Sequence, residues 1–449
     1  MSVWQKYWDV TSVAQTAHRG ESIPSLITKG LQSMLVMFGA TIIVPLTLGM
    51  SPQVTLFGMG TGTLLFLLIT KGKSPLTMGS SFAFMIGVLG IIDAYGGPFV
   101  GEHFTHYDRL QYALGGILAA GVVYLVFSVI VKFIGAQKFM NILPHAVTGP
   151  TVVLIGVTLA PHAINLFATN WILGPLTAVI VIGIMMFGKG KLKLYPILVG
   201  FAGAYFVAVI MQLAGATTPA GDPLVNFYAA SQAQIFGLPP FMAPRFHIIP
   251  ILMLAPFALA TISENIADHV IIGQEMGEDL VREKPGLSRA LFADGVQSMV
   301  AASFGTPMNT TYSENVGLLI ITKVFSSIVV AIGALFAILL GLSPAFAEII
   351  RSIPDAIIGG ASIMLYGMIA SIGMRNIKEH VDLNITKYLI IMSVMLVVGI
   401  GMRFGTPIVV QIAQESVRLD RMNLPVAIIL GVILNLVLPN NPGVGEEKK

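Results

Sequence analysis

The chain has 449 residues, of which 10 % are charged and 55 % are hydrophobic. A soluble domain is roughly 25 % charged, so this composition excludes a disordered chain, a nucleic-acid-binding protein and an ordinary cytosolic enzyme. The net charge is only +3, and without cysteine there is no disulfide, thiolate nucleophile or cysteine-ligated metal. The sequence therefore predicts a polytopic membrane protein.

Apolar blocks of spanning length recur between residues 25 and 439. A spanning helix needs about 20 apolar residues, and we expect fourteen spans. The blocks at 76–92 and 309–322 are short and contain polar residues, which indicates discontinuous spans. Residues 1–24 lack the short apolar core of a signal peptide, and we expect them and residues 441–449 to be cytoplasmic segments.

The distribution of positive charge supports this topology. With the N-terminus in the cytoplasm, 19 of the 25 lysines and arginines fall in cytoplasmic loops. All 15 lysines are among them, as the positive-inside rule expects. We therefore predict a multi-pass protein of the cytoplasmic (inner) membrane, with both termini in the cytoplasm.

Two short patterns occur once in each half of the chain. The pattern P-x-A-x-x-G begins at Pro144 and again at Pro354. Ser-Pro at 74–75 precedes the first broken span, and Thr-Pro at 306–307 precedes the second. These echoes predict a duplicated unit of seven spans, and an odd number of spans forces the second copy to be inverted.

Inverted repeats with matching discontinuous spans are typical of transporters, in which the site lies between the breaks. Aligning Ser74 with Thr306 places Phe82 opposite Glu314. A helix that begins at such a break offers free N–H groups and the positive end of its dipole to a polar ligand. We therefore expect the site at these two helix starts.

Several ionisable residues lie inside predicted spans, where they are costly and commonly functional. Glu264 and Asp268 are four residues apart and share one face of the eighth span. Two like charges repel in a low dielectric, so one of the two should bind a proton. Glu314 and Asn315 lie beside the second break, and Asp294 lies in the ninth span.

This set of carboxylate, amide and backbone groups suits a neutral planar ligand with paired donors and acceptors. For some of these residues, a structural role explains the polar side chain as well as or better than ligand binding does. Asp268 could equally hold the eighth span to a neighbour, and Asp294, expected near a helix start or a glycine turn, is explained slightly better by structure. His269 is better explained by packing or hydration. Only the symmetric position of Phe82 distinguishes it from an ordinary core residue.

The stretch from Glu264 to Phe325 resembles the nucleobase–ascorbate transporter family, also called the nucleobase:cation symporter-2 family. The family signature is an acidic or amide residue, then Asn-x-Gly, four residues, Thr and a basic residue. Residues 314–323 match it with the sequence ENVGLLIITK. The likeness covers roughly residues 25–440, with further motifs in order at 37–41, 62–64, 79–84 and 353–354.

The resemblance implies an all-α membrane fold of fourteen transmembrane segments in two inverted seven-span repeats, with short strands in discontinuous spans 3 and 10. It implies a core domain of residues 25–135 and 246–343 and a gate domain of residues 136–245 and 344–440. It also implies a homodimer.

Proton-coupled uptake of nucleobases is the function that the resemblance implies. It implies ligand contacts at Glu264 and Glu314 and backbone contacts with the substrate near Phe82 and Ser313. From the pairing of two acids on one helix face, we expect Glu264 and Asp268 to be the proton-coupling residues. The predicted substrate-binding residues are Glu264, Glu314, Phe82, Ser313, Tyr312 and Asn315.

Glu at the first signature position is typical of the uracil branch of the family, whereas Gln is typical of xanthine and urate carriers. We therefore expect import of uracil by alternating access. A xanthine or oxopurine–proton symporter is the alternative, because Asp268 and Asp294 would fit it.

An anion exchanger or channel of the same fold is a third hypothesis. An anion site favours helix N-termini without facing carboxylates, so Glu264 and Glu314 argue against it. We expect no enzyme activity, cofactor, metal or nucleic-acid partner. The expected partners are a small nucleobase, protons, the lipid bilayer and a second copy of the chain.

Overall fold

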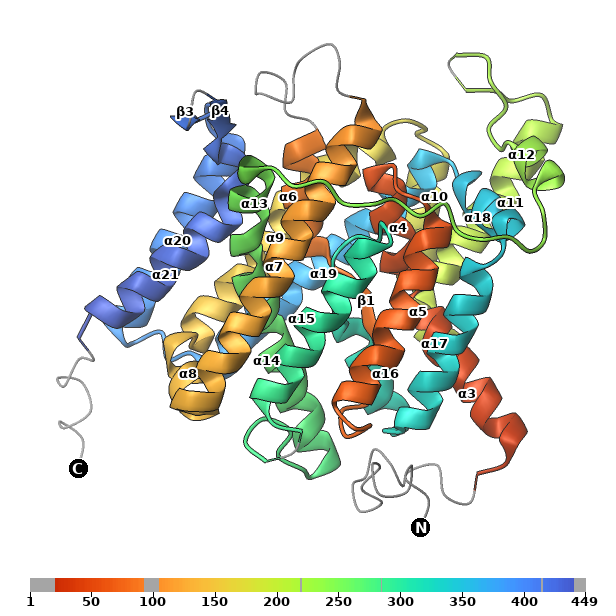
Figure 1. The fold of residues 1–449 in the computed structure, drawn as a ribbon. Coiled ribbons are helices and arrows are strands. Elements are labelled where there is room, and N and C mark those ends of the chain that lie inside the picture. Colours follow the sequence, from red (N-terminus) through yellow and green to blue (C-terminus); the bar gives the residue numbers. More distant parts are fainter. Residues whose placement is uncertain (1–20, 93–104, 219, 284, 413–414, 440–449) are drawn as a thin grey trace.

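The computed structural model describes residues 21–92, 105–218, 220–283, 285–412 and 415–439 (Figure 1). Helices make up most of these residues, and the short strands form two separate pairs.

The elements of the first half are α3 (Ile23–Val36), α4 (Phe38–Leu48), α5 (Pro52–Ile69), β1 (Met78–Ser80), α6 (Phe82–Ile92), α7 (His106–Ile134), α8 (Ala136–Ile142), α9 (His145–Phe167), α10 (Leu173–Phe187), η1 (Gly190–Leu194), α11 (Pro196–Leu213) and α12 (Phe227–Gln232).

The second half contains α13 (Ile248–Leu254), η2 (Ala255–Phe257), α14 (Ala258–Met276), α15 (Leu287–Ser303), β2 (Asn309–Thr311), α16 (Ser313–Thr322), α17 (Ser327–Gly341), α18 (Pro344–Arg351), α19 (Asp355–His380), α20 (Thr386–Phe404), β3 (Val409–Ile412), β4 (Glu415–Arg418), η3 (Leu419–Met422) and α21 (Asn423–Val437).

Proline and glycine set several helix boundaries. Pro144 and Pro354, which open the repeated pattern, are the N-caps of α9 and α19. Gly49 and Gly277 end α4 and α14 with φ values of 68° and 70°, a left-handed conformation that strains residues with a side chain. The repeated pattern therefore marks the start of a long helix in each half.

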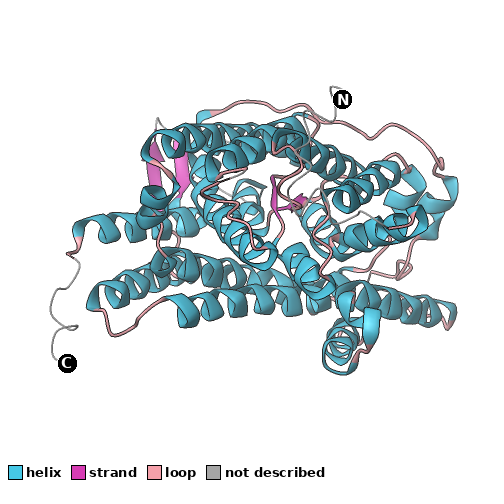
Figure 2. Cartoon of the chain, turned by 90° about the horizontal axis from the view of Figure 1, so that it is seen from below, coloured by secondary structure: helices cyan, strands magenta, loops and turns pink. Residues whose placement is uncertain are grey.

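The two broken spans meet through a short antiparallel strand pair. In β1 and β2, Met78 pairs with Thr311 and Gly79 pairs with Thr310. All six strand residues are buried, and the pair lies at the centre of the molecule when it is viewed from below (Figure 2). Backbone polar groups inside a membrane need protein partners, and each broken segment supplies them to the other.

The two broken segments have the same local layout. β1 begins at Met78 and is followed by a helix that begins at Phe82, and β2 begins at Asn309 and is followed by a helix that begins at Ser313. Aligning the strand starts therefore also aligns the helix starts, and it places Phe82 opposite Ser313. The sequence echo had placed Phe82 opposite Glu314, so the structure shifts this alignment by one position.

The helices pack in two groups. In one group, α17 packs on α3 and α5, and α15 packs on α5 and α7; in the other, α19 packs on α9 and α10, and α20 packs on α21. Glycines bring α9 and α19 close together, since a Cβ on Gly156 would lie 2.4 Å from the carbonyl oxygen of Tyr366. Small residues of this kind let membrane helices approach closely.

An extended strap of residues 233–247 crosses one end of the first helix group (Figure 1). The amide of Gly237 donates to the carbonyl of Leu342, just after α17, at 2.9 Å. The amide of Arg245 donates to the carbonyl of Gln111 on α7, also at 2.9 Å. The strap thereby connects the ends of helices that are distant in sequence.

Nine helices or helix pairs in the described residues are long and apolar enough to cross a membrane, or ten if the bent pair α17–α18 forms one span. The shorter apolar helices α6 and α10 fall below this length. Large apolar side chains also face outward, such as Phe187 at 75 % exposure and Leu213 at 83 %. Length and composition therefore identify a multi-pass membrane protein, and the fourteen spans stay a prediction.

Candidate functional site

The candidate site is built from two helix starts at the centre of the fold. Phe82 begins α6 after a single residue that follows β1, and Ser313 begins α16 after a single residue that follows β2. The first N–H groups of a helix have no partner within that helix, so each start can donate to a ligand. Ser313 and Glu314 lie in the first turn of α16, and their side chains lie outside the described part of the structure.

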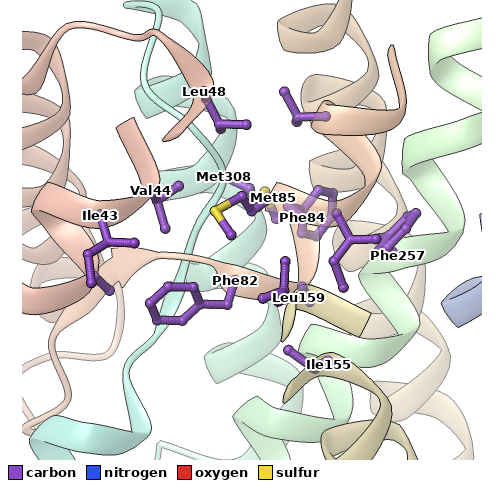
Figure 3. Close-up of a cluster of buried hydrophobic side chains, with 14 of the residues drawn as sticks. Ile43, Val44, Leu48, Phe82, Phe84, Met85, Ile155, Leu159, Phe257 and Met308 are labelled. Carbon is purple, nitrogen blue, oxygen red and sulfur yellow. The ribbon is translucent and has the colours of Figure 1, made fainter. Parts of the chain in front are cut away.

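Phe82 connects the first broken segment to the second helix group. Its ring packs edge-on against Tyr366 of α19, with ring centroids 5.6 Å apart and an interplanar angle of 77°. It belongs to a buried hydrophobic cluster with Ile43 of α4 and with Ile155 and Leu159 of α9 (Figure 3). The predicted contact residue therefore lies where α6 meets α9 and α19.

Tyr312 joins the second broken segment to α4 and β1. The amide of Ala40 donates to its hydroxyl oxygen at 3.2 Å. A Cβ on Gly79 would lie only 2.8 Å from its ring, so this glycine lets β1 approach the ring. Tyr312, predicted as a substrate-binding residue, thus holds the two broken segments against α4.

Asn315 makes a second connection between the broken segments. Its side-chain amide donates to the hydroxyl of Thr77, which directly precedes β1. Asn315 is fully buried. The structure therefore gives this predicted site residue a structural contact between the segments.

The eighth predicted span corresponds to α14, which packs against both β2 and α16. Glu264 is partly exposed, whereas Asp268, one turn later, is only 2 % exposed. α14 also contacts α9 of the second helix group. Glu264 therefore lies on a helix that borders the second broken segment and the opposite group.

Asp294 lies in the middle of α15, and the expectation of a helix start or glycine turn was wrong. Its carboxylate accepts from Asn265 Nδ2 of α14 at 2.7 Å and from Gln297 Nε2 at 2.8 Å. The same Gln297 amide donates to the carbonyl of Asn309 in β2 at 2.9 Å. A buried polar network thus connects α14, α15 and β2.

Two members of this network were missed by the sequence analysis, Gln297 and Asn309. Gln297 is three residues from Asp294 and so shares its helix face, and a polar side chain in a predicted span was the available signal. Asn309 continues the network, because its Nδ2 donates to the carbonyl of Gly58 on α5 at 3.1 Å.

His269 has a packing role, as its sequence position suggested. Its side chain is fully buried. One ring nitrogen lies 2.8 Å from the carbonyl oxygen of Asn265, and the other lies 3.0 Å from the hydroxyl of Ser74. These contacts connect α14 to the segment before β1.

The arrangement combines the positive ends of two helix dipoles with at least one accessible carboxylate. Helix starts favour ligand oxygens and a carboxylate favours N–H donors, so the site suits a neutral molecule that carries both. Among the described residues, no group of three or more His, Cys, Asp or Glu side chains is arranged to hold a metal ion.

Comparison with known families identifies the chain as a permease. The sequence model of the permease family matches residues 24–408. The uracil permease of Bacillus subtilis (strain 168) is 35 % identical over 435 residues, which cover 92 % of this chain and 93 % of the relative. The uracil permease of Bacillus caldolyticus is 36 % identical over 439 residues, with 94 % and 93 % covered.

Solved structures share the fold at much lower identity. The transmembrane domain of the cyanobacterial bicarbonate transporter BicA aligns with a TM-score of 0.63 and 14 % identity, covering 92 % of this chain and 96 % of that chain. SLC26A9 aligns with a TM-score of 0.64 and 9 % identity, covering 97 % of this chain and 66 % of that chain. The chain therefore belongs to the permease family, the nucleobase–ascorbate transporter family that its motifs resemble, and is a membrane transport protein rather than an enzyme.

Proposed function

We propose that this protein is a proton-coupled symporter that imports uracil across the cytoplasmic membrane. The observation that carries the proposal is the set of uracil permeases that are 35 % and 36 % identical to it over more than nine-tenths of each chain. The acidic first position of the signature, Glu314, supports the same substrate. Uracil is a small neutral ring with two N–H donors and two carbonyl acceptors, which suits the two helix starts and a carboxylate.

In the proposed site, Glu264 accepts ring N–H groups and Glu314 takes a second ring donor. Backbone N–H groups at Phe82 and Ser313 bind the carbonyl oxygens. Tyr312 and Asn315 complete the site by holding the broken segments in register, which their contacts with Ala40 and Thr77 support.

Glu264 and Asp268 are the proposed proton-coupling residues. They lie one turn apart on α14, so the charge state of one affects the other. An inward proton gains about 2.3 kcal/mol per 100 mV of membrane potential, which is enough for one proton to drive useful accumulation of a neutral base.

Transport would proceed by alternating access between a core domain (25–135 and 246–343) and a gate domain (136–245 and 344–440). The two packing groups of helices support this division. We further propose fourteen spans in two inverted repeats, a homodimer, and cytoplasmic positions for both termini.

Two alternatives have specific support. A xanthine or oxopurine symporter would use the same fold, with Asp268 and Asp294 nearby. An anion exchanger is favoured by the fold of the bicarbonate transporter domain, but a carboxylate beside the helix starts disfavours an anion.

Uptake of radiolabelled uracil into proteoliposomes tests the proposal. We expect an inward proton gradient to drive accumulation, excess unlabelled xanthine to leave it unchanged, and a protonophore to abolish it. Xanthine entry without uracil entry would instead identify a purine carrier. Uracil uptake that does not depend on the proton gradient would refute proton coupling. A current that depends on chloride or bicarbonate, without uptake of a base, would identify an anion transporter.

A further inference from the structure

A groove separate from the candidate site lies between α3, the second half of α16 and the start of α17. Its volume is about 560 Å³, within the range of pockets that hold sizeable organic ligands. The lining residues on which the argument rests are Ser25, Lys29, Ser33, Leu318, Leu319 and Val329.

The polar wall of the groove carries the positive charge of Lys29, and the negative charge of Glu21 lies beside it, outside the lining residues. The Lys29 ammonium forms an ion pair with the carboxylate of Glu21, just before α3. The hydroxyl of Ser25 donates to the same carboxylate at 2.6 Å. Both charged side chains are more than a quarter exposed, so a polar ligand can reach them from the mouth of the groove.

The inner wall of the groove is apolar and buried. Leu319 and Val329 are each 2 % exposed, and Leu318 is 6 % exposed. Ser33 lies beside them at 1 % exposure, and its hydroxyl has no hydrogen-bond partner among the described residues. The groove therefore runs from a charged mouth to an apolar floor with one hydroxyl.

The helices beside the groove present apolar side chains to their surroundings. On α3, Ile23, Ile27 and Leu31 are 72 %, 44 % and 39 % exposed, and their spacing of four residues places them on one face. On α16, Ile321 is 70 % exposed. In a membrane protein such surfaces contact acyl chains, so a bilayer lipid can enter the groove from the side.

We propose that this groove binds a zwitterionic phospholipid of the phosphatidylethanolamine class. The lipid phosphate pairs with Lys29 and the lipid ammonium pairs with Glu21, which replaces one ion pair by two. Ser33 donates to an ester oxygen, and one acyl chain covers Leu318, Leu319 and Val329. An anionic headgroup leaves Glu21 without a cation, and a choline headgroup has no N–H to donate to it.

Native mass spectrometry of the full-length protein tests this assignment. The delipidated protein is mixed with equal amounts of phosphatidylethanolamine, phosphatidylcholine and phosphatidylglycerol. We expect one phosphatidylethanolamine to be retained at least tenfold over either competitor, and we expect Lys29→Ala to abolish this preference. Lys323→Ala is the matched control, because Lys323 is also ion-paired, to Glu275, but does not line the groove.

A charge swap, Glu21→Lys with Lys29→Glu, keeps the ion pair but reverses the order of its charges. We expect this variant to lose the lipid even if Lys29→Ala proves unstable. Equal retention of the three lipids would overturn the proposal. Wild-type retention by the swapped variant, or an equal loss in Lys323→Ala, would overturn it as well.

Discussion

Asn265 on α14 donates a hydrogen bond of 2.7 Å to Asp294 on α15, 29 residues later in the chain. Both side chains are fully buried. A buried carboxylate needs such partners, because an unpaired buried charge is strongly destabilising. This contact ties the helix that carries Glu264 to the helix whose Gln297 holds β2, so it connects the candidate site to its scaffold.

Asp294→Asn should therefore damage both stability and transport. Asn265 and Gln297 donate to different oxygens of Asp294. The new amide keeps one acceptor oxygen but turns an NH2 donor toward one of these two amides, and a lost hydrogen bond to a charged group costs about 1.5–3 kcal/mol. We expect at least a tenfold loss of uracil uptake and a clearly lower unfolding temperature in detergent. Asp222→Asn, at an exposed loop position, is the control. Normal uptake and normal stability in Asp294→Asn would refute a role for the network.

Glu264→Gln should abolish uptake without unfolding the protein. The substitution keeps the size of the side chain but removes the charge that we propose accepts ring N–H groups and couples the proton. Because Glu264 is partly exposed and Gln has nearly the same shape, we expect the unfolding temperature to stay close to that of the wild type. Uptake and unfolding temperature should be measured together, with the exposed Glu283→Gln as control. Wild-type uptake would remove Glu264 from the site.

Gly79→Ala should impair transport by disturbing the strand pair. The added Cβ would lie 2.8 Å from Cδ2 of Tyr312, so the ring or β1 must move. Overpacking of this kind costs typically about 1–3 kcal/mol. We predict a several-fold lower uptake, while Gly367→Ala, where no heavy atom lies within 4 Å of the new Cβ, should leave uptake unchanged. Equal uptake by the two variants would contradict a rigid contact between β1 and Tyr312.

Gly115→Ala should displace the strap. A Cβ at this position on α7 would lie 2.0 Å from the carbonyl oxygen of Arg245, and a backbone atom cannot move aside as a flexible side chain can. We expect faster proteolysis within residues 233–247 and a lower unfolding temperature. Gly183→Ala on α10 meets no heavy atom within 4 Å and serves as the control. An unchanged cleavage rate in Gly115→Ala would show that the strap is not held at this point.

Arg245→Ala should have little effect on stability, although it removes an ion pair of 2.9 Å with Asp108. The arginine side chain is half exposed, and exposed ion pairs contribute only about 0–1 kcal/mol. The backbone hydrogen bond from Arg245 to Gln111 survives the substitution. We expect the unfolding temperature to change far less than in Gly115→Ala, and an equal change would contradict this ranking.

Local patterns in the sequence predicted the parts of the fold that depend on neighbouring residues. Apolar blocks predicted membrane helices because burial in lipid requires such composition over a length of about 20 residues. Polar residues in the blocks 76–92 and 309–322 indicated the two breaks, and the resemblance added the strands that the structure contains. The repeated proline pattern located the starts of α9 and α19.

Such local patterns could not predict contacts between segments that are distant in the sequence. The sequence echo aligned Phe82 with Glu314, whereas the helix starts align it with Ser313, because two repeats can differ by one residue in a turn. Asp294 was judged from its neighbour Gly295 alone. Its partner Asn265 lies on another helix, and only helix packing brings the two together.

The sequence by itself determined that this protein is a polytopic membrane protein with two broken spans and acidic residues in its spans, and its motifs resembled a transporter family. These properties follow from composition, short motifs and the cost of placing charge in lipid. The tertiary structure decided that Tyr312 and Asn315 hold the broken segments, that Phe82 meets Tyr366, and that Asp294 joins a buried network. Each of these contacts depends on how whole helices pack, and packing is a property of the assembled chain.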